Sequence, residues 1–518
     1  MITTQDRPGL ASKPQNAAPG KADGPIAGSD AVFAVGLCLI AAPCLIFLIS
    51  FMRPGIGWPL AAALALLLLR LVAGERWRFP LRLVIPAAVL ALATVLLVGI
   101  PQGHSCGDWT KHWALLNEIA GHPWPVSLIL HGQQVYLRFY LACYLCPAQM
   151  HKAFPLLPLV AAVTAWFFAG YMVVFWSIGA AFRRRPWWAA GLGMFLAAML
   201  AGGDAYVRQF AGVMSHHPLH GWLGYHYPIW PGLWGWPYQF DPMIANLAWV
   251  PHQSLGAFIA AAIILFDRGR FGLARAIAAF GLLSLWTPYG MMGLLPVIAF
   301  RCWRERRALA GLYPIAAAAL GGVFALLIAS YLSTGLTQSV VHFDLRSISL
   351  TEIGFVPVFL VVELAAFLLI LRRRMFLEPY CAVAVAVLAV VPFLHGNTFD
   401  FVARASMGPL FILAVYSADS LLDFGLVRRK LASVALALAI CLPTSVSEIF
   451  YQAEKGAVYH TADGSKLPEA KVYGEFSDGH TITAAQLFDS CGWEFEWQYF
   501  TPVKPRIIAA GAKGAAAP

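Results

Sequence analysis

The chain has 518 residues, of which 59% are hydrophobic and only 12% are charged, and its mean hydropathy is +0.68. The apolar share lies above that of soluble domains and the charged share below it, so a water-soluble fold is excluded. The formal net charge of +10 does not indicate a nucleic-acid partner, because most basic residues lie in short clusters between apolar stretches, as in the cytoplasmic loops of membrane proteins.

The apolar stretches predict an all-α fold, a polytopic transmembrane bundle of about thirteen helices. Residues 1–30 lack apolar periodicity and are expected to form a disordered cytoplasmic tail. The transmembrane domain, residues 31–449, contains two long outer loops at 101–153 and 202–250, and residues 450–518 are expected to form a small extracytoplasmic domain. The predicted spans are 31–52, 58–72, 83–100, 154–182, 186–201, 249–266, 271–286, 289–300, 312–332, 355–371, 380–394, 405–422 and 431–449.

The basic clusters predict the orientation. With the N-terminus in the cytoplasm, all of them fall on the cytoplasmic side, as the positive-inside rule requires. The two spans that meet at Trp286–Gly290 are short, but a single kinked span would put the clusters at Arg275 and Arg301 on opposite faces, so a hairpin is expected there. The six clusters lie at 70–82, 183–185, 268–275, 301–307, 372–374 and 428–430.

In this topology all 14 histidines lie outside or at the outer ends of spans. Histidine serves in acid–base chemistry, metal binding and hydrogen bonding, so the bias marks the outer side as the working face. An equally good explanation is that the cytoplasmic loops are too short to contain any histidine.

The first outer loop contains a candidate general base, Asp108. Apolar residues that follow it recur at helical spacing and predict an interfacial amphipathic helix. Lys111 and His112 lie three and four residues after Asp108, so two potential cations would keep its carboxylate ionised, ready to accept a hydroxyl proton. Alternatively, Asp108 only caps the helix.

Other candidate substrate-binding residues lie further along the outer segments. Arg138 at membrane level needs an anion, which is either a substrate phosphate or a protein carboxylate. The aromatic loop that contains His226 and Asp241 suits either a saccharide platform or an interfacial belt. Near the last spans, Arg404 either pairs with Asp400 or faces a phosphate, and the neighbouring outer loop adds His342.

No metal site is predicted from these residues. His216 and His220 have the spacing of helical zinc ligands, but Pro218 lies between them and no HExxH glutamate is present. Cys106 and Cys491 both fall outside, where a disulfide between them would be compatible with the topology. The chain also lacks a P-loop, a dinucleotide-binding glycine motif and a serine nucleophile elbow, so activated groups must arrive through the lipid, an ion gradient or a partner.

The chain resembles the GT-C superfamily of membrane glycosyltransferases, which have several spans and an outer-face Asp at the start of a long loop. It is similar to bacterial membrane proteins of that type in the segments Asp108–His112, Leu285–Gly290 and Asp400–Ser406. The resemblance implies a polyprenyl-phosphate-linked sugar as donor, a glycan or lipid acceptor, membrane lipids as surroundings, and a site on the outer face of the bacterial inner (plasma) membrane. By this resemblance Asp108 activates the acceptor hydroxyl.

Two features depart from the superfamily pattern. Asp108 follows the third predicted span rather than the first, and no Asp-x-Asp or Glu-x-Asp signature accompanies it, which leaves dependence on a divalent metal open. The main alternative is a secondary transporter or flippase, which would need ionisable residues inside the spans, where Glu363 is the main example. A subunit without catalytic activity is a third interpretation.

Overall fold

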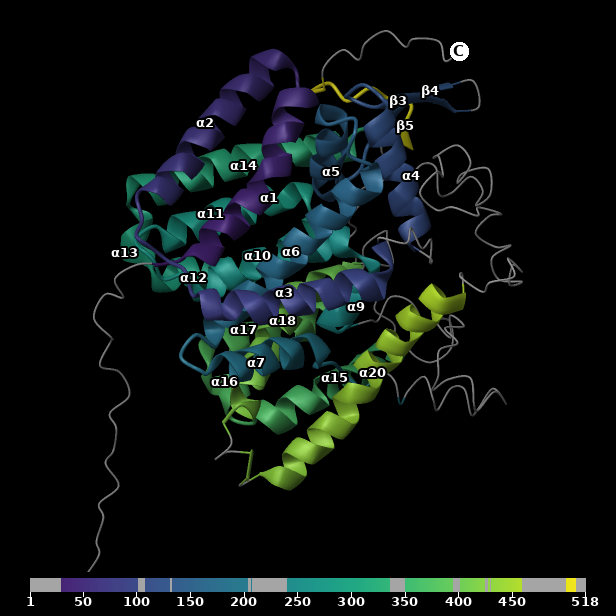
Figure 1. Ribbon diagram of the computed structural model, residues 1–518. Coiled ribbons are helices and arrows are strands. Elements are labelled where there is room, and N and C mark those ends of the chain that lie inside the picture. The colour runs from purple at the N-terminus through teal and green to yellow at the C-terminus, as the bar shows by residue number, and fades with distance from the viewer. Residues whose placement is uncertain are drawn as a thin grey trace, which may run out of the picture.

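The structure is a computed structural model that describes residues 29–100, 108–130, 133–203, 206, 240–335, 350–394, 401–423, 427–428, 430–458 and 500–508. Most of this part of the chain is helical (Figure 1). The helices are α1 (Ala31–Ser50), α2 (Pro54–Ala73), α3 (Leu81–Val98), α4 (Asp108–Gly121), α5 (Ala142–Ala153), α6 (Leu159–Ala181), α7 (Trp187–Met199), α9 (Met243–Trp249), α10 (Pro251–Phe266), α11 (Gly272–Leu282), α12 (Pro288–Arg304), α13 (Arg306–Leu309), α14 (Leu312–Ser333), α15 (Leu350–Leu371), α16 (Arg374–Leu377), α17 (Pro379–Val390), α18 (Phe401–Leu421) and α20 (Leu431–Val458), with 3-10 turns η2 (Leu283–Leu285) and η4 (Val391–Phe393).

Each predicted span coincides with a helix, so the prediction of an all-α membrane protein is confirmed. Among the described residues, eight helices are long and apolar enough to cross a membrane: α1, α2, α3, α6, α14, α15, α18 and α20. The other predicted spans match helices of 17 residues or fewer, and the count of thirteen crossings stays a prediction. Leu69 on α2 and Ile85 on α3 are more than 60% exposed, as side chains in contact with lipid tails would be.

The core of the bundle lies around α10. Every residue of this helix from Pro251 to Leu265 is buried, and a helix that is apolar on all sides needs such a position. Small residues let its neighbours approach closely. At Gly256 a Cβ atom would lie 2.7 Å from the ring of Trp286, so that indole packs directly on the α10 backbone.

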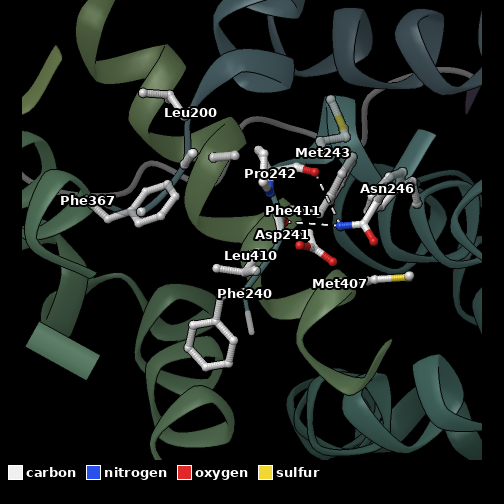
Figure 2. Close-up of a pocket in the computed structure, with 14 residues that line it drawn as sticks. Leu200, Phe240, Asp241, Pro242, Met243, Asn246, Phe367, Met407, Leu410 and Phe411 are labelled. Carbon is white, nitrogen blue, oxygen red and sulfur yellow. Dashed lines mark hydrogen bonds between the residues drawn. The ribbon is translucent and has the colours of Figure 1, made fainter. Parts of the chain in front are cut away.

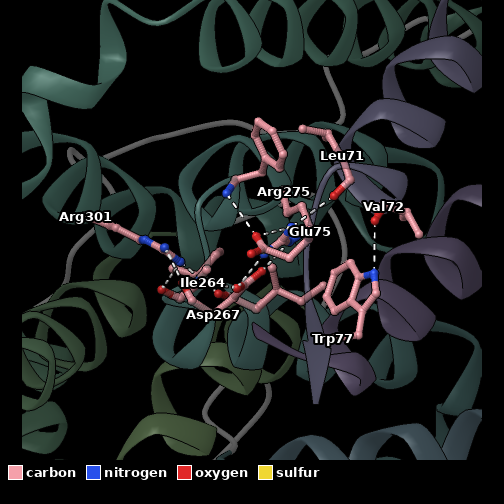
Figure 3. Close-up of polar contacts among 11 residues, drawn as sticks. Leu71, Val72, Glu75, Trp77, Ile264, Asp267, Arg275 and Arg301 are labelled. Carbon is pink, nitrogen blue, oxygen red and sulfur yellow. Dashed lines mark hydrogen bonds and ion pairs between the residues drawn. The ribbon is translucent and has the colours of Figure 1, made fainter. Parts of the chain in front are cut away.

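An ion-pair network joins the start of α11 to the end of α12, where a hairpin was expected (Figure 3). Near the start of α11, Arg275 donates from Nε to the Asp267 carboxylate at 2.6 Å. Near the end of α12, Arg301 donates from Nη2 to the Asp267 carbonyl, also at 2.6 Å. One residue thus binds both arginines, which requires the chain to reverse direction between them. Glu75, from the segment after α2, adds a second carboxylate beside Arg275 at 3.4 Å.

The basic clusters gather at one end of the bundle, where α13 and α16 lie at the left of Figure 1. Contacts between loops that are distant in sequence hold them together, and Lys430 of the last cluster lines the same cavity as Arg372–Arg374. This grouping agrees with the predicted sidedness, although the membrane face itself stays a prediction. The connecting contacts are Arg82 to the Arg183 carbonyl, Arg185 and Arg374 to Asp419, Arg275 to Glu75, and Arg268 to Glu305.

The opposite end carries α4 and a small sheet, at the right of Figure 1. Strands β3 (Ser127–Leu130) and β4 (Gln133–Leu137) form an antiparallel hairpin, and β5 (Phe500–Thr501) adds to β4. Near the basic end, β1 (Ser29–Asp30) pairs in parallel with β2 (Trp77–Arg78).

The predicted terminal regions are described only in part. Helix α20 continues past the predicted end at Ile449 to Val458, and residues 500–508 join the outer sheet and the turn after α1, where the Arg53 amide donates to the Ile507 carbonyl at 3.0 Å. Residues 1–28, 459–499 and 509–518, and with them Cys491, lie outside the described residues, as does Cys106.

Candidate functional site around helix α9

Helix α9 is a seven-residue helix that lies between two prolines and marks the centre of the candidate site. Pro251 begins α10, and a residue before proline is driven out of the helical conformation. Val250 accordingly has φ −133° and ψ 48°, which separates α9 from α10. The predicted span 249–266 is therefore α10 alone, and the segment that leads into it is a separate buried helix.

The C-terminal end of α9 is held by side chains from three neighbouring helices. The last four carbonyls of a helix have no partner within it and must find one elsewhere. In α9 each of them accepts a side-chain hydrogen bond from α10, α6 or α4. The pairs are Ser254 Oγ to the Asn246 carbonyl at 3.0 Å, Tyr171 hydroxyl to Leu247 at 2.8 Å, Trp109 Nε1 to Ala248 at 2.9 Å, and His112 Nε2 to Trp249 at 3.4 Å.

Helix α4 is the amphipathic helix that the sequence predicts, and its apolar face is docked into the protein. Trp109 and Trp113 are buried, and the Trp109 ring meets Phe167 of α6 edge to face at 5.3 Å between centroids. Asp108 is the first residue of α4. The structure describes only the helical backbone of Asp108 and Lys111, so the expected interaction of their side chains stays a prediction.

The His112 imidazole is 2% exposed, so it lies in the protein interior. A carbonyl oxygen only accepts hydrogen bonds, so Nε2 carries the hydrogen that faces the Trp249 carbonyl. Nδ1 then accepts from the Tyr144 hydroxyl at 2.8 Å. In this arrangement both ring nitrogens have a hydrogen-bond partner in the protein interior.

A second buried imidazole, His252, lies against the first, with ring centroids 4.5 Å apart. It stacks almost parallel on Tyr140, at 5.7 Å and 6°. Gln253 Nε2 lies 3.1 Å from His252 Nε2 and 3.3 Å from the Tyr140 hydroxyl, while its carbonyl accepts from Thr287 at 3.1 Å. Since the amide nitrogen only donates, Nε2 of His252 is an acceptor.

The N-terminal end of α9 borders a narrow apolar pocket that holds Asp241 (Figure 2). Among the described residues that line it, Asp241 alone is ionisable, beside side chains such as Phe367 and Met407. Asn246 Nδ2 donates to the Asp241 backbone carbonyl at 3.1 Å and so fixes the turn before α9. The space is about 10 Å³, enough for about one water molecule.

Arg138 has a structural partner. Its Nη1 donates at 2.8 Å to the carbonyl of Thr334, just after α14, where a cation is favoured by the helix dipole. Burial lowers the pKa of this guanidinium, and Tyr331 partly offsets the effect. The Tyr331 hydroxyl also donates to the Leu137 carbonyl at 2.8 Å. Arg138 thus joins the outer hairpin to α14.

Arg404 is buried on α18, one turn before the pocket residue Met407. Its expected partner Asp400 lies outside the described residues, as do His226 and His342, so their predicted roles are untested. In the described part of the chain, no group of three His, Cys, Asp or Glu side chains is placed to hold a metal ion. Whether the protein needs a divalent metal therefore stays open.

Sequence reasoning did not single out Gln253 or Thr287 as site residues. A signal for Gln253 was present, because two polar residues, Gln253 and Ser254, open an otherwise apolar stretch. Thr287 lies in the Trp-Thr-Pro turn, where it also caps α12 by accepting from the Gly290 amide at 3.1 Å.

The site therefore combines two acidic positions with buried neutral hydrogen-bonding groups. Asp108 begins the helix docked on the C-terminal end of α9, and Asp241 precedes its N-terminal end. Carboxylates at a membrane boundary are suited to accept a proton from a substrate hydroxyl. No protein-family model, curated protein or solved structure matches the chain.

Proposed function

We propose that this chain is a multi-pass membrane glycosyltransferase of the GT-C type, which moves a sugar from polyprenyl phosphate to an extracytoplasmic glycan or lipid. The observation that carries the proposal is the docking of α4 on α9, at the end of the bundle away from the basic clusters. By the positive-inside rule that end faces outward, and the enzyme would lie in the bacterial plasma membrane.

Asp108 would act as the general base. A catalytic group must be held within a fraction of an ångström of its working position, and the neighbouring Trp109 is anchored by its indole to the Ala248 carbonyl. The first turn of a helix also favours a carboxylate through the helix dipole. The helix dipole would thus favour the ionised form of Asp108.

The donor would reach the site along α9. This helix is about 10 Å long, and Asp108 and Asp241 would lie near its two ends. Arg404, near the pocket, would face the lipid-linked phosphate, because a guanidinium forms bidentate hydrogen bonds with oxyanions. Binding would require the pocket side chains to move apart, since the present space holds about one water molecule.

The test is Asp108→Asn, with Glu118→Gln as the matched control on the same helix. Asn preserves shape and capping but accepts no proton, so transfer of labelled sugar from polyprenyl phosphate in membrane vesicles should fall by ~10² to 10⁴. Loss of a cap alone would lower stability by ~1 kcal/mol and leave the rate intact. Glu118, which pairs with His122 at 3.0 Å, should tolerate the change. Full activity of Asp108→Asn would reduce Asp108 to a helix cap.

One observation favours the alternative of a secondary transporter. Glu363 is 2% exposed within α15, and a Cβ atom at Gly202 would overlap its carboxylate. An acid buried in a membrane span is a candidate for ion coupling. Mass spectrometry of co-purified lipid separates the two functions, because a bound polyprenyl phosphate supports transfer. Ion-coupled uptake that Glu363→Gln abolishes would support transport.

A further inference from the structure

A basic cavity of about 500 Å³ lies at the end of the bundle opposite α4. It is formed where α15 and α18 end and α20 begins, three helices apolar enough to span a membrane. Its lining includes five cations and two carboxylates, an excess of three positive charges. The cations are Arg185, Arg372, Arg373, Arg374 and Lys430.

Two of these cations share one carboxylate. Asp419 binds Arg185 at 3.3 Å through one carboxylate oxygen and Arg374 at 3.1 Å through the other. Arg374 also donates to the Ser420 hydroxyl at 3.1 Å. These contacts hold the two guanidinium groups in place in the wall of the cavity.

The remaining cations have more freedom to bind a ligand. Arg372 donates to the Ser433 hydroxyl but has no carboxylate partner in the described chain. Arg373 and Lys430 make neither a hydrogen bond nor an ion pair through their side chains with any residue that the structure describes. Arg372 has a φ of 50°, a conformation unusual for a side chain of its size, and this turn places three consecutive arginines around one space.

We propose that this cavity binds a phosphate group, carried either by an anionic phospholipid headgroup or by a soluble phosphate. Phosphate is recognised by guanidinium and ammonium groups that lie around one space and outnumber the nearby carboxylates. The ends of three candidate spans place the cavity at headgroup level, and basic pockets between cytoplasmic helix ends are suited to anionic lipids. This inference is independent of the proposed transferase activity.

The test compares two double variants that remove the same charge. Arg373→Gln with Lys430→Gln alters the cavity, while Arg306→Gln with Arg307→Gln removes two exposed cations of α13. Native mass spectrometry of the purified full chain would measure binding of phosphatidylglycerol and phosphatidylcholine, and thermal unfolding without added lipid would measure the effect of inorganic phosphate. The wild type should prefer phosphatidylglycerol, and the cavity variant should lose about tenfold in affinity while the α13 variant keeps it.

Each outcome has a defined meaning. Selective loss of phosphatidylglycerol binding in the cavity variant supports a lipid source. Stabilisation by inorganic phosphate that only the cavity variant loses supports a soluble source. The proposal is overturned if both double variants lose affinity equally. It is also overturned if the wild type neither prefers phosphatidylglycerol to phosphatidylcholine nor is stabilised by inorganic phosphate. The binding of the wild type is measured without reference to any variant. A negative result for the wild type therefore overturns the proposal even if the cavity variant does not fold.

Discussion

His112 and His252 lie ring to ring in the protein interior, yet hydrogen bonding assigns the accepting role to different nitrogens. Nδ1 is the acceptor in His112 and Nε2 is the acceptor in His252. A proton added to either ring would place a charge among aromatic side chains and remove an acceptor. The pair therefore joins α4 to α10, and Tyr144 joins α5 to His112.

The hydrogen bond between Tyr144 and His112 provides a test of this role. Tyr144→Phe leaves the buried Nδ1 atom without its donor, so the free energy of unfolding should fall by about 1–3 kcal/mol. Combining it with His112→Phe should cost less than the sum of the two single losses, because the hydrogen bond that the two residues share is removed only once. Denaturation in detergent measures both, with Tyr136→Phe as control. Strictly additive losses would contradict a direct coupling.

Lys152, at the end of α5, provides a pH-dependent test. Its amine donates to the His122 carbonyl and lies 4.3 Å from the Trp124 ring centroid. Burial lowers its pKa from 10.5 to about 8. The unfolded chain thus binds more protons between about pH 8 and 10.5, so this residue makes stability rise with pH across that window. The effect is small, because the amine is half exposed.

The same pKa makes a chemical prediction. About half of the Lys152 amine is neutral at about pH 8, so its acylation rate should level off just above that pH. Peptide mass spectrometry after brief labelling at a series of pH values measures the rate, and Lys152→Arg identifies the signal. A rate that rises without levelling across the whole window would exclude the lowered pKa.

At the scale of elements, α11 and α14 pack through facing glycines. A Cβ atom at Gly281 would lie 2.5 Å from the Gly321 Cα, so the two backbones are in direct contact. The next glycine along α14 is Gly322, and a Cβ atom added there would have no other atom within 4 Å. These two positions separate packing from helix propensity.

Gly281→Ala should therefore destabilise the protein, and Gly322→Ala should not. Forcing the helices apart costs about 1–3 kcal/mol, whereas alanine for glycine in an open helix position adds about 0.5–1 kcal/mol of stability. Unfolding of the two variants in the same detergent gives the comparison. Equal stability of both variants would show that α11 and α14 can move apart without a loss of stability.

At the scale of the whole molecule, hydropathy was sufficient to predict the helices, because apolar segments are local signals. Pro251 separates α9 from α10, and an average of hydropathy over an apolar window does not detect this break. The capping of α9 by Trp109 and Tyr171 joins positions distant in sequence, which no spacing rule connects. For the same reason the contacts of His112 with Trp249 and Tyr144 were not predictable.

The orientation of the whole bundle gives the last prediction. Ion pairs and hydrogen bonds join basic loops at one end, so placing them on opposite sides of a membrane would break contacts such as Arg374–Asp419. With the nine native cysteines replaced, Arg184→Cys and Arg307→Cys should react with an impermeant maleimide only after cells are permeabilised. Gln133→Cys, exposed on the outer hairpin, should react in intact cells. Labelling of Arg307→Cys in intact cells would show that the protein has the opposite orientation in the membrane. Asp108 would then lie in the cytoplasm, and the basis for a lipid-linked donor at α4 would be removed.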